Sequence, residues 1–171
     1  MGITHVVYDM DGLLLDTERF YTQVTQTIVG RYGHTFDWSL KSRMIGKKAI
    51  DSARILVETL KLPIAPEEYL HEREAYLDVL FPTVEPMPGA MRLTTHLARH
   101  GIPQAVATSS RRRDFELKVS RHGEWFACFQ SIRVAAERVP HQREIEATAL
   151  LRLPNMGQLV DEEALWAEWF F

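Results

Sequence analysis

The feature that most constrains the fold of this 171-residue chain is a pair of aspartates directly after a short apolar segment. Residues 4–8 are rich in β-branched and aromatic side chains, and Asp9, Asp11 and Gly12 follow them. An apolar run of this length that ends at a turn residue is typical of a strand buried in a parallel sheet. Open α/β sheets bind their ligands at the carboxyl ends of such strands. The sequence therefore predicts a functional site around the two carboxylates.

The remaining pattern predicts alternating helices and strands. Asp16 or Thr17 can cap a first helix that continues to Gly33. Three more helical patterns precede the prolines near residue 86, and they cover residues 38–44, 50–60 and 66–80. A helix that carries Met91, Leu93 and Leu97 then leads to a strand at 104–108, a helix from Ser109 to Gly123 and a strand at 131–135. This order predicts an α/β fold with a parallel sheet and right-handed crossovers.

The residues after Ala136 give a weaker pattern. Segments 141–152 and 158–170 are predicted to be amphipathic helices, and no fourth strand is predicted. We find no internal repeat or low-complexity segment.

Composition limits the classes of protein and partner. The 46% hydrophobic and 25% charged residues are typical of a soluble globular domain. A net charge of -3 predicts no nucleic-acid or anionic-membrane partner, and no apolar run reaches transmembrane length. Cys128 has no second cysteine with which to form an internal disulfide, and the N-terminus lacks a secretory signal pattern. We therefore expect a cytoplasmic protein, and the sequence gives no indication of a protein partner.

The two aspartates have a catalytic and a structural interpretation. Asp9 could attack phosphorus as a nucleophile if a hard cation screened its charge from an anionic substrate. Asp11 could protonate the leaving oxygen and then deprotonate a water molecule. Alternatively, both carboxylates could simply accept hydrogen bonds from loop amides. For an isolated pair of aspartates with this spacing, the structural interpretation is the favoured one. Metal-dependent glycosyltransferases also use two aspartates separated by one residue.

Three further motifs remain open in the same way. Thr108, Ser109 and Ser110 end the second strand, where they could bind a phosphate or merely cap a helix. The arginines at 111–113 could lie beside an anion or pair with Asp114 and Glu116. Lys47 and Lys48, which follow Gly46 in the helical insert, could reach a substrate or be ordinary surface lysines.

Taken together, these motifs resemble the haloacid dehalogenase-like phosphatase superfamily. The stretches that carry the resemblance are residues 9–18, 44–49, 87–90, 100–103, 107–110 and 120–122. The resemblance implies a truncated, Rossmann-like parallel core with an inserted all-helical cap. Residues 1–16 and 87–171 would form the core, which is incomplete at its C-terminal side, and residues 17–86 would form the cap.

The resemblance also implies roles for individual residues. Asp9 would be the nucleophile that forms an aspartyl-phosphate and a Mg²⁺ ligand. Asp11 would be the general acid/base and would give Mg²⁺ its backbone carbonyl. Thr108 and the Ser109 amide would bind the transferring phosphoryl group. Gly46, Lys47 and Lys48 would lie near the specificity loop of a mobile cap. The substrate would be a small phosphorylated metabolite such as pseudouridine 5'-phosphate.

Two motifs of that superfamily are missing. A lysine after the third strand and acidic Mg²⁺ ligands after a fourth strand are not found, and Lys118 is the last lysine of the chain. The substitutes that can be considered are Arg133, Arg138 and Arg143 for the lysine, and Asp161, Glu162 and Glu163 for the acids. Loss of the later strands would also place the Asp9 strand at a sheet edge.

We therefore expect weak Mg²⁺ binding and reduced or lost activity. The alternatives are a non-catalytic truncated variant that acts only by binding and, less favoured, a sugar phosphomutase.

Overall fold

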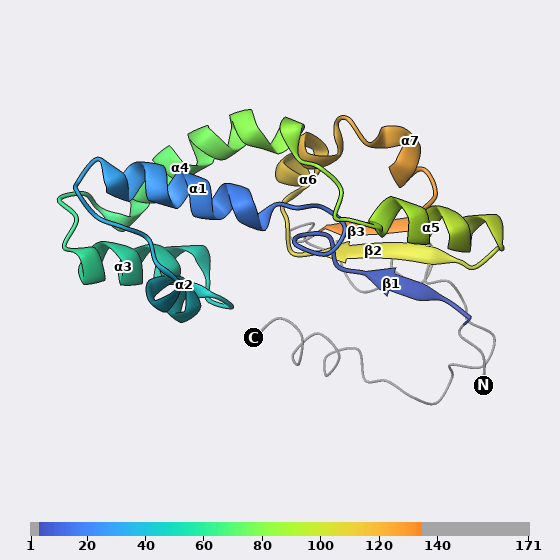
Figure 1. The fold of residues 1–171 in the computed structure, drawn as a ribbon, viewed down its shortest axis with the longest axis horizontal. Coiled ribbons are helices and arrows are strands. Elements are labelled where there is room, and N and C mark those ends of the chain that lie inside the picture. Colours follow the sequence, from blue (N-terminus) through green and yellow to red (C-terminus); the bar gives the residue numbers. More distant parts are fainter. Residues whose placement is uncertain (1–3, 135–171) are drawn as a thin grey trace, which may run out of the picture.

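The structure, a computed structural model, describes residues 4–134, which form two lobes side by side (Figure 1). The helical lobe consists of α1 (Glu18–Gly30), α2 (Trp38–Met44), α3 (Ala49–Leu60) and α4 (Pro66–Leu80). A 3₁₀ turn, η1 (Phe81–Thr83), follows α4. The sheet lobe consists of β1 (Val6–Tyr8), α5 (Ala90–Arg99), β2 (Gln104–Thr108), α6 (Arg112–Val119), α7 (Gly123–Phe126) and β3 (Ser131–Val134).

The helices of the helical lobe begin and end close to the predicted residues. In α1, the predicted apolar positions Phe20, Val24 and Ile28 are buried, because they recur once per turn on one face. The helix ends at Gly30, three residues before Gly33, which has a positive φ of 76°. The helix α4 begins at Pro66, where the missing amide proton costs nothing. Local periodicity and turn residues were therefore sufficient for this lobe.

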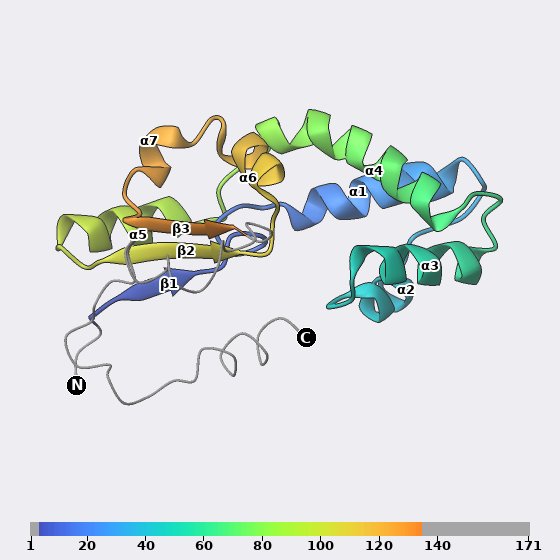
Figure 2. The ribbon, with the colours of Figure 1, turned by 180° about the vertical axis from the view of Figure 1, so that it is seen from behind.

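The sheet is parallel, as predicted, and its strand order is β1-β2-β3. Val6 pairs with Gln104, and Ala105 pairs with Ser131. Each new strand adds on the same side of the sheet, so right-handed crossovers place all connecting helices on one face. Figures 1 and 2 show α5, α6 and α7 together on that face. Within residues 4–134, β1 lies at an edge of the sheet, as expected.

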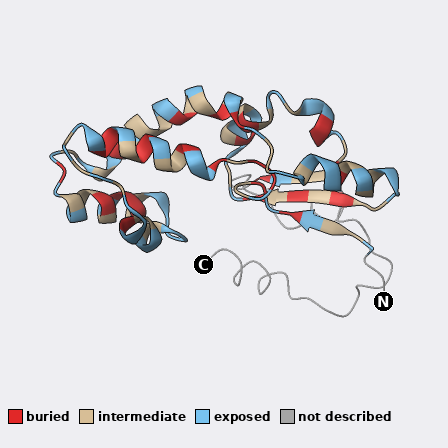
Figure 3. Cartoon of the chain, in the orientation of Figure 1, coloured by how far each residue is buried: buried red, intermediate tan, exposed pale blue. Residues whose placement is uncertain are grey.

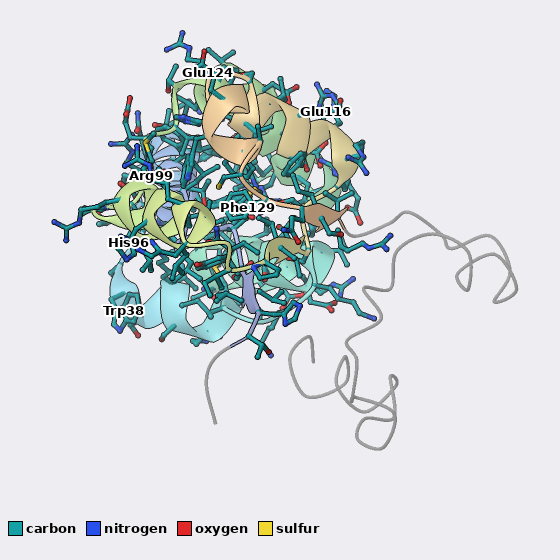
Figure 4. All side chains as sticks on the ribbon, turned by 90° about the vertical axis from the view of Figure 1, so that its right-hand side faces the viewer. Trp38, His96, Arg99, Glu116, Glu124 and Phe129 are labelled. Carbon is teal, nitrogen blue, oxygen red and sulfur yellow. The ribbon has the colours of Figure 1, made fainter. Side chains whose placement is uncertain are left out.

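Polar residues connect the sheet to its covering helices. The Gln104 side chain accepts a 2.9 Å bond from the Tyr8 hydroxyl and donates a 2.9 Å bond to the Thr94 carbonyl. The indole of Trp125 donates to the Thr94 hydroxyl at 2.8 Å. Figure 3 shows buried residues along α1 and α3 in one lobe and along β2 in the other. Figure 4 shows Phe129 in the interior of the molecule.

Two of the apolar residues of α5 lie on its exposed side. Met91 and Leu93 are 45% and 52% exposed, whereas Thr94 is fully buried. Thr94 takes the inner position because its hydroxyl and carbonyl are both used in hydrogen bonds to Trp125 and Gln104. The short helix α7 was not predicted, since four residues carry no periodic signal.

Two short connecting segments join the lobes. The Asp16 amide donates to the Glu85 carbonyl at 2.9 Å, and the Met87 amide donates to the Leu14 carbonyl at 2.8 Å. The chain thus enters and leaves the helical lobe through paired backbone segments. No helix within residues 4–134 combines the length and apolar character needed to cross a membrane.

Several expectations fall outside the described residues. These are Ala135 at the end of the third strand, the helices at 141–152 and 158–170, and the substitute side chains Arg138, Arg143, Asp161, Glu162 and Glu163.

Candidate active site

The loop after β1 presents Asp9 and Asp11 at the carboxyl edge of the sheet. The side chain of Met10 between them is fully buried, and its carbonyl accepts the amides of Leu14 and Leu15 at 3.0 Å each. Gly12 has a φ of 74°, a left-handed conformation that glycine adopts without strain. The loop therefore folds back on an anchored Met10.

Asp11 is held by groups from the end of β2 and from α6. Its Oδ2 accepts a 2.8 Å bond from the Ser110 hydroxyl and a longer 3.4 Å bond from the Thr108 hydroxyl. Its Oδ1 accepts a 2.7 Å bond from Nζ of Lys118. Lys118 also donates to the Ser110 hydroxyl at 2.8 Å, so the three side chains form a closed network.

Lys118 is the site residue that sequence reasoning missed. Its side chain is 0% exposed although it lies on a short helix that is otherwise rich in charge. We assigned this lysine no role, because the lysine that the resemblance implies follows the third strand, and arginines were considered in its place. The structure places Lys118, which lies on α6 before that strand, against Asp11. Of those arginines, Arg133 lies exposed on β3 and the others lie beyond residue 134.

The two aspartates differ in their electrostatic environment. Burial raises the pKa of Asp9 above its ordinary value; the hydrogen bond from the Met10 amide, at 2.7 Å, opposes this rise, and the charge of Asp11 adds to it. For Asp11, burial also acts to raise the pKa. The charge and hydrogen bond of Lys118, together with the bond from Ser110, outweigh burial and lower the pKa. Asp11 is therefore the more firmly ionised of the pair.

The residues at the end of β2 do not share one role. Thr108 is buried, and its hydroxyl accepts a 3.1 Å bond from the Ser110 amide. Ser109 is exposed. Ser110 belongs to the predicted phosphate motif, but the resemblance gave it no role of its own. In the structure it bridges Asp11 and Lys118.

A cavity of about 690 Å³ lies between the lobes. Asp11, Ser109 and Ser110 line it from the sheet lobe, and Lys47 and Lys48 line it from the helical lobe. The structure thus brings these predicted residues to one space. Gly46 belongs to the same loop as the lysines, with a φ of 76°, but neither it nor Asp9 and Thr108 line the cavity.

Other charged side chains line the cavity, and most of them are paired. Lys41 pairs with Glu18 at 3.1 Å. Arg111 pairs with both Glu74 and Asp114, at 3.0 and 2.9 Å. Among the described residues, the lining cations that form no ion pair with a carboxylate are Lys47, Lys48 and Arg73. The cavity wall opposite Asp11 is therefore electropositive.

The residues described fit only part of a magnesium site. The expected ligands are the carboxylate of Asp9 and the backbone carbonyl of Asp11, whereas Mg²⁺ takes about six oxygens. Both side-chain oxygens of Asp11 already accept hydrogen bonds. In residues 4–134, no three His, Cys, Asp or Glu side chains are grouped to hold a metal ion.

Known proteins share these motifs. A model of the family described as haloacid dehalogenase-like hydrolase matches residues 6–150. The chain is 50% identical over 133 residues to (DL)-glycerol-3-phosphatase 1, mitochondrial, of Arabidopsis thaliana, a match that covers 77% of this chain and 45% of that protein. It is 42% identical over 127 residues to a probable pseudouridine-5'-phosphatase of Drosophila melanogaster, covering 74% and 55%. The chain thus spans about half the length of these relatives.

Solved structures share the fold at low sequence identity. A putative beta-phosphoglucomutase from Thermotoga maritima superposes with a TM-score of 0.64 at 22% identity, over 80% of this chain and 63% of that one. A hydrolase from Deinococcus radiodurans with bound phosphate and sodium has a TM-score of 0.63 at 22% identity, over 77% and 58%. Both matches agree with an α/β fold.

Proposed function

Because the chain belongs to the haloacid dehalogenase-like hydrolase family, we propose that it is a phosphatase of small phosphorylated metabolites with slow turnover. The observation that carries this proposal is the grouping of Asp11, Ser110 and Lys118 beside Asp9 at the carboxyl edge of the sheet. In this proposal, residues 1–16 and 87–171 form the core, and residues 17–86 form the cap that covers the substrate.

The proposed reaction has two steps. An oxygen of Asp9 attacks phosphorus, the ester P–O bond breaks, and the leaving oxygen takes a proton from Asp11. A water molecule then attacks the phosphoryl-aspartate, gives its proton to Asp11, and releases inorganic phosphate. Thr108 and the Ser109 amide would contact the transferring group. Lys118, next to Asp11, places a positive charge at the site where an anion must bind.

The same geometry supports the proposal that turnover is slow. The first step needs Asp9 ionised and Asp11 protonated. The pKa of Asp9 is raised and that of Asp11 is lowered. As the pH falls, Asp9 is therefore protonated before Asp11, which is the opposite of what the first step needs. The expected cofactor, Mg²⁺, would be held weakly by Asp9 and the Asp11 carbonyl.

The proposed substrate carries its leaving group in the cavity between the lobes. Lys47 and Lys48 supply unpaired positive charge there, and Thr22, Thr25 and Ser52 supply hydroxyl groups. Such a wall suits a polyol or ribose phosphate, and pseudouridine 5'-phosphate and glycerol 3-phosphate are the two compounds to compare. We also propose a cytoplasmic location; mitochondrial import of a tagged chain would contradict it.

Hydrolysis of these two compounds and of p-nitrophenyl phosphate tests the proposal. We expect slow phosphate release that Asp9→Asn abolishes, together with an acid-stable phosphoenzyme in the unmutated chain. Asp51→Asn, an exposed acid on α3, is the matched control and should change neither result. Phosphate release that survives Asp9→Asn would contradict the assignment.

The second candidate function is binding without catalysis. It is favoured by the ion pair of Asp11 with Lys118 and by the incomplete metal site that residues 4–134 provide. Calorimetry that detects inorganic phosphate binding in a chain without phosphoenzyme or turnover would support it, whereas tight Mg²⁺ binding would count against it. A sugar-phosphate isomerisation assay distinguishes the phosphomutase alternative.

A further inference from the structure

The ammonium group of Lys118 is buried between two hydrogen-bond acceptors and two aromatic rings. Its two hydrogen bonds go to Asp11 and Ser110, and the side chain is 0% exposed. The ring of Phe81 lies beneath Nζ, with its centroid 4.5 Å away, and the ring of Tyr21 lies at 5.9 Å. An aromatic face attracts a cation, and the attraction is strongest where water is excluded.

Both rings come from the helical lobe. Phe81 is the first residue of η1, where the chain leaves α4, and it is only 3% exposed. Tyr21 lies in the first turn of α1, where the chain enters the lobe, and its ring packs edge-to-face against Phe81 at 6.0 Å. The turn η1 in turn packs against α6, which carries Lys118. The Lys118 ammonium of the sheet lobe is thus covered by two rings at the points where the chain enters and leaves the helical lobe.

We propose that Phe81, supported by Tyr21, is a positioning residue that holds the Lys118 ammonium against Asp11. A lysine side chain has four rotatable carbon bonds, so two hydrogen bonds alone leave it many competing orientations. The aromatic cover removes water from the remaining face of the ammonium and restricts it to the direction of Asp11. The proposal rests on the proposed function only for its catalytic consequence, since the position of Lys118 is measurable without turnover.

Substitution of Phe81 by residues of similar size tests whether the side chain that covers Lys118 must be aromatic or only apolar. Phe81→Met conserves an apolar side chain of similar volume but removes the aromatic face, whereas Phe81→Tyr retains it. Phe115→Met is the matched control, because Phe115 is a buried ring on α6 that packs against Phe126 at 6.0 Å.

The readout is the rate at which an amine-reactive acetylating reagent modifies Lys118 in the folded protein, followed by mass spectrometry. We expect Phe81→Met to raise this rate about tenfold, and Phe81→Tyr and Phe115→Met to leave it within about twofold of the unmutated chain. Should Phe81→Met not fold, Tyr21→Leu against Tyr21→Phe makes the same comparison at the second ring.

Three results would overturn the proposal: Lys118 as protected in Phe81→Met as in the unmutated chain, equal labelling in Phe81→Met and Phe81→Tyr, or equal labelling in Phe81→Met and Phe115→Met. Failure of the proposed phosphatase function is recognised separately, because it appears as absent phosphoenzyme while the labelling pattern remains.

Discussion

Arg111, directly after the Ser109–Ser110 turn, forms a 3.0 Å ion pair with Glu74 of α4 and so connects the sheet lobe to the helical lobe. Arg113 forms a second pair of this kind with Asp78, at 2.6 Å. Two of the three consecutive arginines therefore contact carboxylates of the opposite lobe. The sequence left open whether these arginines lie beside an anion or pair with carboxylates, and Arg111 and Arg113 pair with carboxylates.

These ion pairs between the lobes should be weak and sensitive to salt. Arg113 and Asp78 are 62% and 32% exposed, so water and salt screen their charges. A double-mutant cycle with Arg113→Ala and Asp78→Ala, measured by urea unfolding, should give a small favourable coupling at low salt and almost none at about 1 M salt. The pair Arg54–Asp51, within one helix, is the control. A coupling that is as large at about 1 M salt as at low salt would contradict this prediction.

Removal of Lys118 should cost more than removal of any surface lysine. Lys118→Met leaves the partly buried Asp11 carboxylate without its cation, which we expect to lower the free energy of unfolding by about 2 kcal/mol. Lys48→Met, at an exposed position, should change it by less than about 0.5 kcal/mol. The double variant Lys118→Met/Asp11→Asn should recover part of the loss. A Lys118→Met protein as stable as Lys48→Met would show that the pair is not formed.

The two aspartates should affect stability with opposite sign at neutral pH. The folded pKa of Asp11 is lowered, so its ionised form stabilises the fold above the unfolded pKa of about 3.9, and this contribution disappears as the pH falls through the folded pKa. The folded pKa of Asp9 is raised, so its contribution is present below about 3.9 and is lost as the pH rises through the folded pKa.

Asp11→Asn should therefore destabilise the protein at pH 7, and Asp9→Asn should stabilise it by about 0.5 kcal/mol. Urea unfolding at a series of pH values checks both, and each difference should shrink in acid. Destabilisation by Asp9→Asn at neutral pH would contradict the assigned environments.

Glycine should be required at position 46 because of the backbone conformation there, and not because a larger side chain would clash. Its φ is 76°, and a Cβ there would meet nothing within 4 Å. Gly46→Ala should therefore cost about 1 kcal/mol from backbone strain alone. At Gly123 there is also nothing within 4 Å, and φ lies outside the left-handed region. Gly123→Ala should be neutral in the same thermal-unfolding assay, and an equal loss in both variants would contradict this account.

Lys47 and Lys48 should contribute to anion binding in the cavity. Both line it and neither pairs with a carboxylate among residues 4–134. The double variant Lys47→Ala/Lys48→Ala should weaken the calorimetric affinity for inorganic phosphate about tenfold at low salt, because two positive charges are lost. Arg43→Ala, an exposed cation on α2 outside the cavity, should leave the affinity unchanged. An equal effect of both changes would indicate only a general charge effect.

The sequence by itself determined the order of elements and the placement of the two aspartates. Apolar runs that end at Asp9 and Thr108 predicted two neighbouring strand ends, and β2 covers the predicted residues, from Gln104 to Thr108. Helical spacing and Pro66 likewise predicted where helices begin, and Gly33 marked the end of α1 to within three residues. These features depend on local backbone preferences, which neighbouring residues fix.

Only the tertiary structure decided which side chains complete the site. Lys118 lies 107 residues from Asp11 in the chain, and Phe81 covers it from a different lobe. Most lysines are exposed, so no local pattern marks one that is buried. Its burial is favourable only because the β2–α6 crossover brings it to a carboxylate and η1 brings it to a ring. Such compensation depends on distances between distant segments, which periodicity and turn residues do not specify.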